Sequence, residues 1–197
     1  MRLTKWFNEF YGFPVRLNHL LRCISPYLED VEKVLDLGAS SGRLAKELSR
    51  IRPHAHFSCL DVYVPEKTFI PVQRYDGRQI PFPDSFFDCV MIVDVLHHDE
   101  DPEAILREAK RVSKKYILIK DHYWETRADF LLLCYADYIG NKPYGIPLPY
   151  NFLKLPDWNN LIGKTQLTVS KSEQFRYTPI DICKHVIFLL EKQKPNS

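Results

Sequence analysis

The chain has 197 residues, a length that suits a single domain with one buried core. Its 27 Lys and Arg residues against 25 Asp and Glu residues leave a formal net charge of +2, so charge gives no reason to expect a nucleic acid or an anionic membrane as partner. The five cysteines are widely spaced, without a C-x-x-C pair, and predict reduced thiols and a cytoplasmic protein. No apolar run approaches the length of a membrane span and the N-terminus lacks a signal-peptide stretch, so we expect neither stable membrane insertion nor export.

The N-terminal segment is rich in aromatic and aliphatic side chains. Their spacing over residues 4–28 predicts one or two amphipathic helices, interrupted near Gly12 and Pro14. We expect these helices to form a cap of residues 1–30 at one end of the domain.

Strands and helices then alternate along the chain. The candidate strands are residues 33–37, 56–61, 70–75, 87–94 and 115–120. The last two are nearly continuous apolar runs, which is typical of parallel strands buried on both faces. Before the last of them, Asp101 and Pro102 predict the start of a helix whose buried stripe is Ile105, Leu106, Ala109 and Val112.

The C-terminal third departs from this alternation. Residues 123–158 predict a short helix from Phe130 to Ala136 and an irregular cover over 140–156, which is either a substrate lid or a structural insertion. Strands at 166–171 and 184–191 then predict an antiparallel hairpin. The expected fold is therefore a Rossmann-like α/β domain with a doubly wound, mostly parallel seven-stranded sheet and an antiparallel C-terminal edge.

A glycine-containing turn follows the first strand. The apolar run reaches Asp36, and the turn from Gly38 to Gly42 leads into a helical pattern of Leu44, Leu48 and Ile51. We expect Ser40 or Ser41 to cap this helix, and unpaired N–H groups at its start to face a ligand. The spacing fits neither a P-loop nor the dinucleotide G-x-G-x-x-G pattern.

The turn resembles the first motif of class I S-adenosylmethionine-dependent methyltransferases, D-x-G-x-G-x-G, read here as Asp36, Gly38, Ser40 and Gly42 with serine in place of one glycine. From Tyr75 to Pro102 the chain continues with Asp-Gly, Pro-Phe, Phe-Asp, Val-Leu-His-His and Asp-Pro. This series is similar to the methyltransferase type 11 family, which is related to ubiquinone and menaquinone biosynthesis enzymes. The resemblance covers about residues 31–121, the expected cofactor-binding core.

The resemblance implies S-adenosylmethionine as cofactor. Asp61 would accept the ribose hydroxyls, Asp76 and the Gly77 N–H would contact the adenine, and Asp94 would hold the amino end. For Asp61 and Asp76 the alternative is an ordinary turn at a strand end. The full set of expected cofactor contacts is Asp36, Gly38, Ser40, Gly42, Asp61, Val62, Asp76, Gly77 and Asp94.

The link between the second and third strands departs from the family. Only 14 residues separate Asp61 from Asp76, and they include Pro65 and Pro71. This is too little for the usual connecting helix, so we expect it to be shortened or missing.

Three histidines follow the fourth and fifth strands. His97 or His98 would line the acceptor pocket, and His122 would act as a general base, with His97 as the second candidate catalytic residue. The alternative is that these histidines pack or are solvated. Together with Asp121 they lack a recognised zinc-ligand spacing, so no metal is expected.

The sequence therefore predicts a methyltransferase that acts on a small or medium, partly apolar acceptor as its partner. The segments would be the cap (1–30), the core (31–121), a substrate-cover insertion (123–158) and the hairpin edge (159–191). The alternative is a non-catalytic protein that binds S-adenosylmethionine or regulates a partner. A nicotinamide oxidoreductase is disfavoured by the glycine spacing, and a nucleic-acid methyltransferase by the balanced charge. The oligomeric state stays open.

Overall fold

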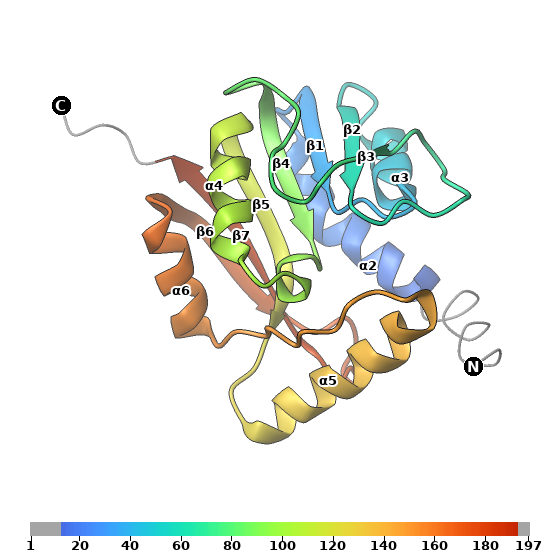
Figure 1. Ribbon diagram of the computed structural model, residues 1–197, viewed down its shortest axis with the longest axis vertical. Coiled ribbons are helices and arrows are strands. Elements are labelled where there is room, and N and C mark those ends of the chain that lie inside the picture. The colour runs from blue at the N-terminus through green and yellow to red at the C-terminus, as the bar shows by residue number, and fades with distance from the viewer. Residues whose placement is uncertain (1–12, 193–197) are drawn as a thin grey trace.

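The computed structural model describes residues 13–192 (Figure 1). The described chain begins with helix α2 (Phe13–Ile24) and the short helix η2 (Ser25–Leu28). The helix predicted within residues 4–12 lies outside the described residues.

Seven strands of the described chain form one sheet in the order β3-β2-β1-β4-β5-β7-β6. They are β1 (Lys33–Leu37), β2 (His56–Asp61), β3 (Gln73–Arg74), β4 (Phe87–Val93), β5 (Ser113–Tyr123), β6 (Leu167–Phe175) and β7 (Lys184–Lys192). The first five pair in parallel, whereas β7 is antiparallel to both β5 and β6. The predicted fold is confirmed.

Helices cover both faces of the sheet, because its central strands are buried on each side. Residues Leu35, Val90 and Ile117 face α4 (Pro102–Val112) and α6 (Leu155–Lys164) in one core cluster. Residues Val34, Met91 and Leu118 belong to a second cluster with α2 and α3 (Arg43–Ile51). This is the alternation that a pleated strand imposes.

The start of α3 differs from its prediction. Gly42, in the left-handed region at φ 71°, is the residue before the helix, and no side chain caps it. Ser40 and Ser41 therefore do not cap α3, because the chain passes through a left-handed turn there. Leu44 and Leu48 pack in the core, but Ile51 is largely exposed.

No helix separates β2 from β3, as predicted, although β3 contains only Gln73 and Arg74 and not the expected 70–75. Within this extended link, Ile70 and Val72 pack on Ala39, Ala45 and Cys59. The link thus covers the apolar surface beside α3 that a helix would otherwise bury.

The segment after β5 is more helical than predicted. Helix α5 (Arg127–Asn141) is twice the expected length, and Thr126 and Asp129 form a capping box at its start. After η4 (Lys142–Tyr144) and an irregular stretch comes α6, which the sequence reading missed. Its Pro156 and Asp157 were the available start signals.

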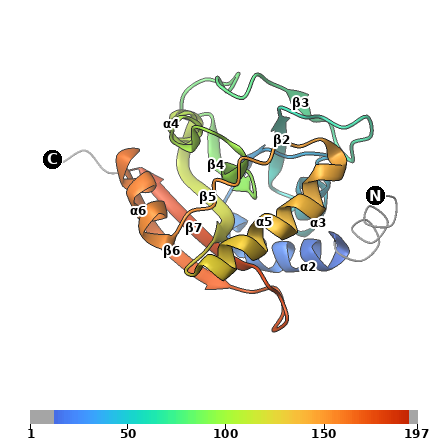
Figure 2. The same cartoon turned by 60° about the horizontal axis from the view of Figure 1, so that its bottom comes forward.

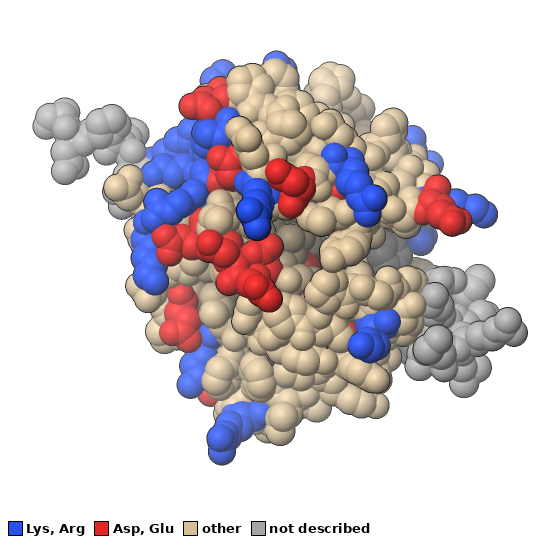
Figure 3. All heavy atoms as spheres, in the orientation of Figure 1, with Lys and Arg blue, Asp and Glu red and all other residues tan. Residues whose placement is uncertain are grey.

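Helix α5 crosses the edge of the sheet at which β4 and β5 end (Figures 1 and 2). The space-filling view shows a hollow between this helix and the rest of the molecule, and few charged side chains over α5 (Figure 3). All five cysteines are free thiols, as predicted. Within the described residues, no helix combines the length and apolar character that a membrane span requires.

Candidate active site

The turn after β1 is held by the protein's own hydrogen bonds. The N–H groups of Gly38 and Ala39 donate to Leu60 O at 2.8 and 3.0 Å, and Gly42 N–H donates to Ala39 O at 2.8 Å. The N–H groups of the turn itself are thus satisfied within the protein, and the prediction that N–H groups at the start of α3 face a ligand stays a prediction.

Glycine is required at the first position of this turn. Gly38 has φ 81°, and an added Cβ would overlap the Val95 side chain. At Gly42, with φ 71°, a Cβ would stand 2.8 Å from Ile70 Cγ1. The serine at position 40 also takes a left-handed conformation, with φ 50°, which glycine adopts with less strain.

Asp36 is buried at the end of β1. It is 2% exposed, and its Oδ2 has no hydrogen-bond partner among the described residues. Burial and the neighbouring Asp61 raise the pKa of the Asp36 carboxyl to about 7. An acid that is partly protonated at neutral pH and lacks a partner is suited to accept a hydrogen bond or a positive charge from a ligand.

Asp61 ends β2 beside the turn. Its Oδ2 accepts a hydrogen bond from Ser40 N–H at 2.6 Å, and its Oδ1 accepts one from Tyr63 N–H at 2.8 Å. Val62 follows, 36% exposed. The two strand ends therefore meet, and the Asp61 carboxylate lies over the glycine turn.

Asp76 follows β3 and is the third acid of this edge. Its Oδ1 accepts from the N–H groups of Arg78 and Gln79 at 2.8 and 3.0 Å, and these bonds lower the pKa of its carboxyl. Gly77 is left-handed at φ 80°. The alternative that Asp76 only stabilises a turn thus accounts for its Oδ1 atom. A cavity of about 320 Å³ lies against the same residue, lined by Gln73, Arg74, Tyr75, Asp76, Gln79 and Pro81.

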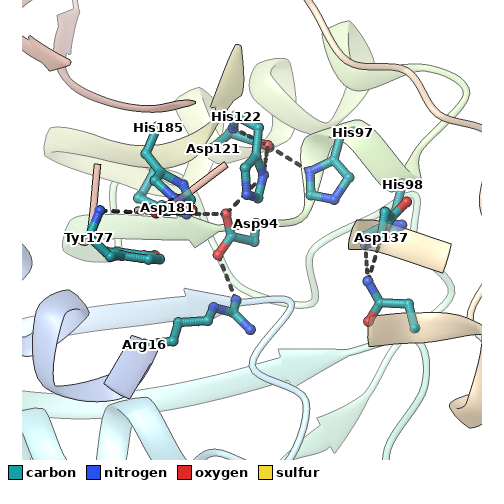
Figure 4. Close-up of polar contacts among 12 residues, drawn as sticks. Arg16, Asp94, His97, His98, Asp121, His122, Asp137, Tyr177, Asp181 and His185 are labelled. Carbon is teal, nitrogen blue, oxygen red and sulfur yellow. Dashed lines mark hydrogen bonds and ion pairs between the residues drawn. The ribbon is translucent and has the colours of Figure 1, made fainter. Parts of the chain in front are cut away.

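Asp94 follows β4 with φ 54° and lies among cations (Figure 4). Its Oδ1 is 2.5 Å from Lys120 Nζ, and its Oδ2 is 2.6 Å from Arg16 Nη2. Burial would raise the pKa of Asp94, but Lys120 and Arg16 hold it well below its usual range. Arg16 thereby fastens α2 to the end of β4.

His97 and Asp121 form a buried pair. His97 Nδ1 lies 2.6 Å from Asp121 Oδ1, and both side chains are at most 3% exposed. Burial opposes the charge on His97, but the Asp121 carboxylate raises the pKa of the imidazole. The Phe152 ring, from the segment before α6, stacks on the His97 ring at 4.8 Å.

His122 has a different environment from His97. Its Nδ1 lies 3.5 Å from carboxylate oxygens of Asp94 and Asp121 and is buried without a hydrogen-bond partner in the described chain. Burial and the charge of Lys120 lower the pKa of His122 to about 3. The imidazole is therefore neutral at physiological pH, and the lowered pKa makes it a weak base.

His98 points toward α5 and the cover. Its Nδ1 is 3.2 Å from Pro147 O, and its Nε2 is 3.7 Å from Asp137 Oδ1. Burial and the adjacent His97 lower the pKa of the His98 imidazole. The fold thus gathers His97, His98 and His122 at one place.

Four residues of this region were not among the sequence candidates: Arg16, Lys120, Asp121 and Asp137. Three of them could have been suspected from the sequence, because each is a charged side chain within an apolar run. Asp137 is the acid in the run from Phe130 to Ile139, and Lys120 and Asp121 interrupt the apolar end of β5. Arg16 had no such signal, because its contact spans 78 positions.

Comparison with known proteins assigns the fold to a class. The family described as "Methyltransferase domain" matches residues 35–116. A solved putative methyltransferase from Haloferax volcanii, in complex with the Trm112 methyltransferase activator, superposes with a TM-score of 0.74 at 16% identity, covering 98% of this chain and 96% of that one. The solved structure thus shows the fold, and the family match covers residues 35–116 of the sheet core.

Curated relatives agree with this class. The demethylmenaquinone methyltransferase of Thermotoga maritima is 32% identical over 116 residues, or 55% of this chain and 51% of that protein. The ubiquinone/menaquinone biosynthesis C-methyltransferase of Cupriavidus pinatubonensis is 26% identical, covering 78% of this chain and 74% of that protein. The chain thus spans about half the length of the first of these two relatives. The predicted resemblance to S-adenosylmethionine-dependent methyltransferases is confirmed over the matched core.

Proposed function

We propose that this protein transfers the methyl group of S-adenosylmethionine to a small or medium, partly apolar acceptor. The observation that carries the proposal is the row of acids at one edge of the sheet. Asp36, Asp61 and Asp76 lie at the carboxyl ends of the adjacent strands β1, β2 and β3, at the edge where ligands bind in open α/β sheets.

The row fits the parts of the cofactor in order. The nucleoside would lie against the turn that begins at Gly38, the Asp61 carboxylate would accept hydrogen bonds from the ribose hydroxyls, and the cavity beside Asp76 would hold the adenine. Asp36 would serve the amino-acid end. Asp94 was expected there too, but its two cationic partners support a positioning role between α2 and β5.

The acceptor side lies at the ends of β4 and β5, beneath α5 and the segment before α6. Aromatic side chains gather there: Phe152 contacts His97, His122 and Phe130. An apolar or aromatic acceptor fits this lining. The two curated relatives are named for quinone biosynthesis, which makes an aromatic ring with an apolar tail the first acceptor class to test.

Methyl transfer from a sulfonium requires in-line approach of the acceptor, and positioning supplies much of the rate. His122, neutral and without a hydrogen-bond partner in the described chain, would take the acceptor proton where one must leave. The His97–Asp121 pair would fix one wall of the pocket.

Titration calorimetry with S-adenosylmethionine and S-adenosylhomocysteine tests the cofactor half of the proposal, with NADH as the comparison ligand. Incubation with methyl-labelled cofactor and demethylmenaquinol-type acceptors, or with a cell extract, tests the transfer. Binding without any labelled product would favour the non-catalytic alternative. Binding of NADH alone would overturn the cofactor assignment.

A further inference from the structure

His97, His98 and Asp137 converge on one point between the end of β4 and helix α5. One ligand atom from each lies within 4.8 Å of those of the other two, and His98 Nε2 is 3.7 Å from Asp137 Oδ1. Ligands about 2.0–2.1 Å from a zinc ion at tetrahedral angles stand about 3.3 Å apart. Small side-chain rotations would therefore bring the three atoms to binding distance.

The two imidazoles are oriented as metal ligands usually are. His97 Nδ1 is bonded to the Asp121 carboxylate at 2.6 Å, and His98 Nδ1 is 3.2 Å from the Pro147 carbonyl oxygen. Each Nδ1 thus donates its proton to an oxygen, which leaves Nε2 with its lone pair. A carboxylate or carbonyl that holds the second nitrogen of a histidine is the usual outer support of a zinc site.

The carboxylate of the trio is buried without a countercharge. Asp137 is 8% exposed on α5, and its Oδ2 has no hydrogen-bond partner in the described chain. The nearby cations, the buried Lys120 and the partly exposed Arg16, are paired with Asp94. A buried carboxylate that lacks a full set of partners carries a cost that a bound cation removes.

The amide of Asn141 marks where that cation would sit. Its Nδ2 is 2.6 Å from Asp137 Oδ1 and 3.4 Å from His98 Nε2. A positively polarised NH₂ group therefore contacts the same two acceptors that a metal ion would contact. Asn141 is the last residue of α5, so its side chain can withdraw without disturbing the helix.

We propose that His97 Nε2, His98 Nε2 and Asp137 bind a divalent transition-metal ion of the Zn²⁺ type, with a fourth position open. Two imidazoles and one carboxylate suit such ions, and three protein ligands with an open position are typical of metals that bind a substrate. Sequence spacing could not reveal the site, because Asp137 lies on α5 in the segment that follows the sheet core. On the proposed function, the open position faces the acceptor side, where it would take an acceptor oxygen.

The test uses the full chain after dialysis against a chelator. Zn²⁺ calorimetry should give one ion per chain, and Co²⁺ should give the visible absorption of a four- or five-coordinate site. We expect His98→Gln and Asp137→Asn each to weaken Zn²⁺ binding more than 100-fold. Asp121→Asn should weaken it by roughly 10- to 100-fold, because Asp121 supports the His97 ligand.

Asn141→Ala separates a metal site from a merely structural cluster. Removing the competing amide should make Zn²⁺ binding tighter, whereas a cluster that only packs gives no such gain. His56→Gln and Asp30→Asn, exposed residues away from the trio, are the matched controls and should bind as the unaltered chain does. Circular dichroism confirms that each variant is folded.

Two results would overturn the proposal: no stoichiometric Zn²⁺ or Co²⁺ binding by the folded chain, or binding that His98→Gln and Asp137→Asn both leave unchanged. S-Adenosylmethionine affinity is measured on the same samples. If the chain binds S-adenosylmethionine but no metal ion, the metal site is wrong and the proposed function is unaffected. If it binds the metal ion but not S-adenosylmethionine, the proposed function is wrong and the metal site is unaffected.

Discussion

The Asp61 carboxylate and the Ser40 N–H are joined by a hydrogen bond of 2.6 Å, which ties the end of β2 to the turn after β1. The bond holds the carboxylate over the turn, where a ribose would lie under the proposed function. Asp61 therefore serves both the turn and the proposed cofactor site, and its two roles can be separated by measurement.

We expect Asp61→Ala to weaken S-adenosylmethionine binding roughly 10- to 150-fold, since a hydrogen bond to a charged group contributes about 1.5–3 kcal/mol. Calorimetry measures the affinity. Asp88→Ala is the matched control, because Asp88 also accepts from strand backbone, at Lys33 N, but at the other end of β1. A folded Asp61→Ala variant with unchanged affinity would assign the residue to the turn alone.

The glycine turn is expected to tolerate no side chain at its first position. Gly38→Ala should lower the free energy of unfolding by about 2–4 kcal/mol, because it adds left-handed strain and overlap with Val95. Gly163→Ala, in α6 with nothing within 4 Å of the added Cβ, should raise that free energy by up to about 1 kcal/mol. Equal urea midpoints for the two variants would contradict this account of the turn.

Asp36 should make stability fall as pH rises. Its pKa is about 7 in the folded chain and about 3.9 in an unfolded one. Between these values the folded state holds a proton that the unfolded state has lost. Stability is therefore highest below pH 4 as far as this group is concerned, and falls by about 1.4 kcal/mol per pH unit until pH 7.

Asp36→Asn removes this dependence. The free energy of unfolding of the variant relative to the unaltered chain should rise from pH 4.5 to pH 7 and then level off, as measured by urea denaturation at each pH. Asp30→Asn, at an exposed acid, gives the background. A relative stability that stays flat over this range would show that Asp36 is ionised in the folded chain.

The strands of the sheet could be predicted from the sequence because buried parallel strands consist of nearly continuous apolar runs. The bounds of β1 and β2 agree with the prediction, and those of β4 differ by one residue. The missing helix before β3 was also predictable, since a short proline-containing link cannot hold one. Helix α6 was missed because its start signals, Pro156 and Asp157, lie in a segment that otherwise reads as irregular.

The site was less predictable than the sheet, because its chemistry depends on contacts between distant segments. The acids at the carboxyl ends of β1, β2 and β3 were found from their order. The partners of Asp94 and His97 were not, since a carboxylate after a strand looks the same whether it faces a ligand or a buried lysine. Only the fold shows that the Asp94 carboxylate forms ion pairs with Lys120 and Arg16.

The cover after α5 should respond to ligands. A cavity of about 460 Å³, lined by residues that include Tyr138, Pro147 and Tyr150, lies within it, and Asn151 fastens it to His97 O and Asp99 O. Amide exchange over residues 142–154 should slow when cofactor and acceptor bind together. The buried amides of β4 serve as the reference. Strong protection in the absence of ligands would make the cover a fixed insertion.

His122 is the residue that we expect to take a proton from the acceptor. It is the penultimate residue of β5, and its Nδ1 has no hydrogen-bond partner in the described chain. Burial and Lys120 lower the pKa of its imidazole to about 3, which keeps it neutral but makes it a weak base. His122→Gln keeps a polar side chain of similar reach. It should lower the rate of methyl transfer by roughly 10²–10⁴-fold and leave the affinity for S-adenosylmethionine nearly unchanged.

His185→Gln is the control for this prediction, because the His185 ring packs 4.7 Å from that of His122 but its Nε2 is bonded to Asp181. It should change the rate little. A loss of less than tenfold in His122→Gln would leave positioning as the source of the rate, since methyl transfer to an acceptor that is already deprotonated needs no base. A parallel loss of cofactor affinity would instead assign His122 to the structure of the site.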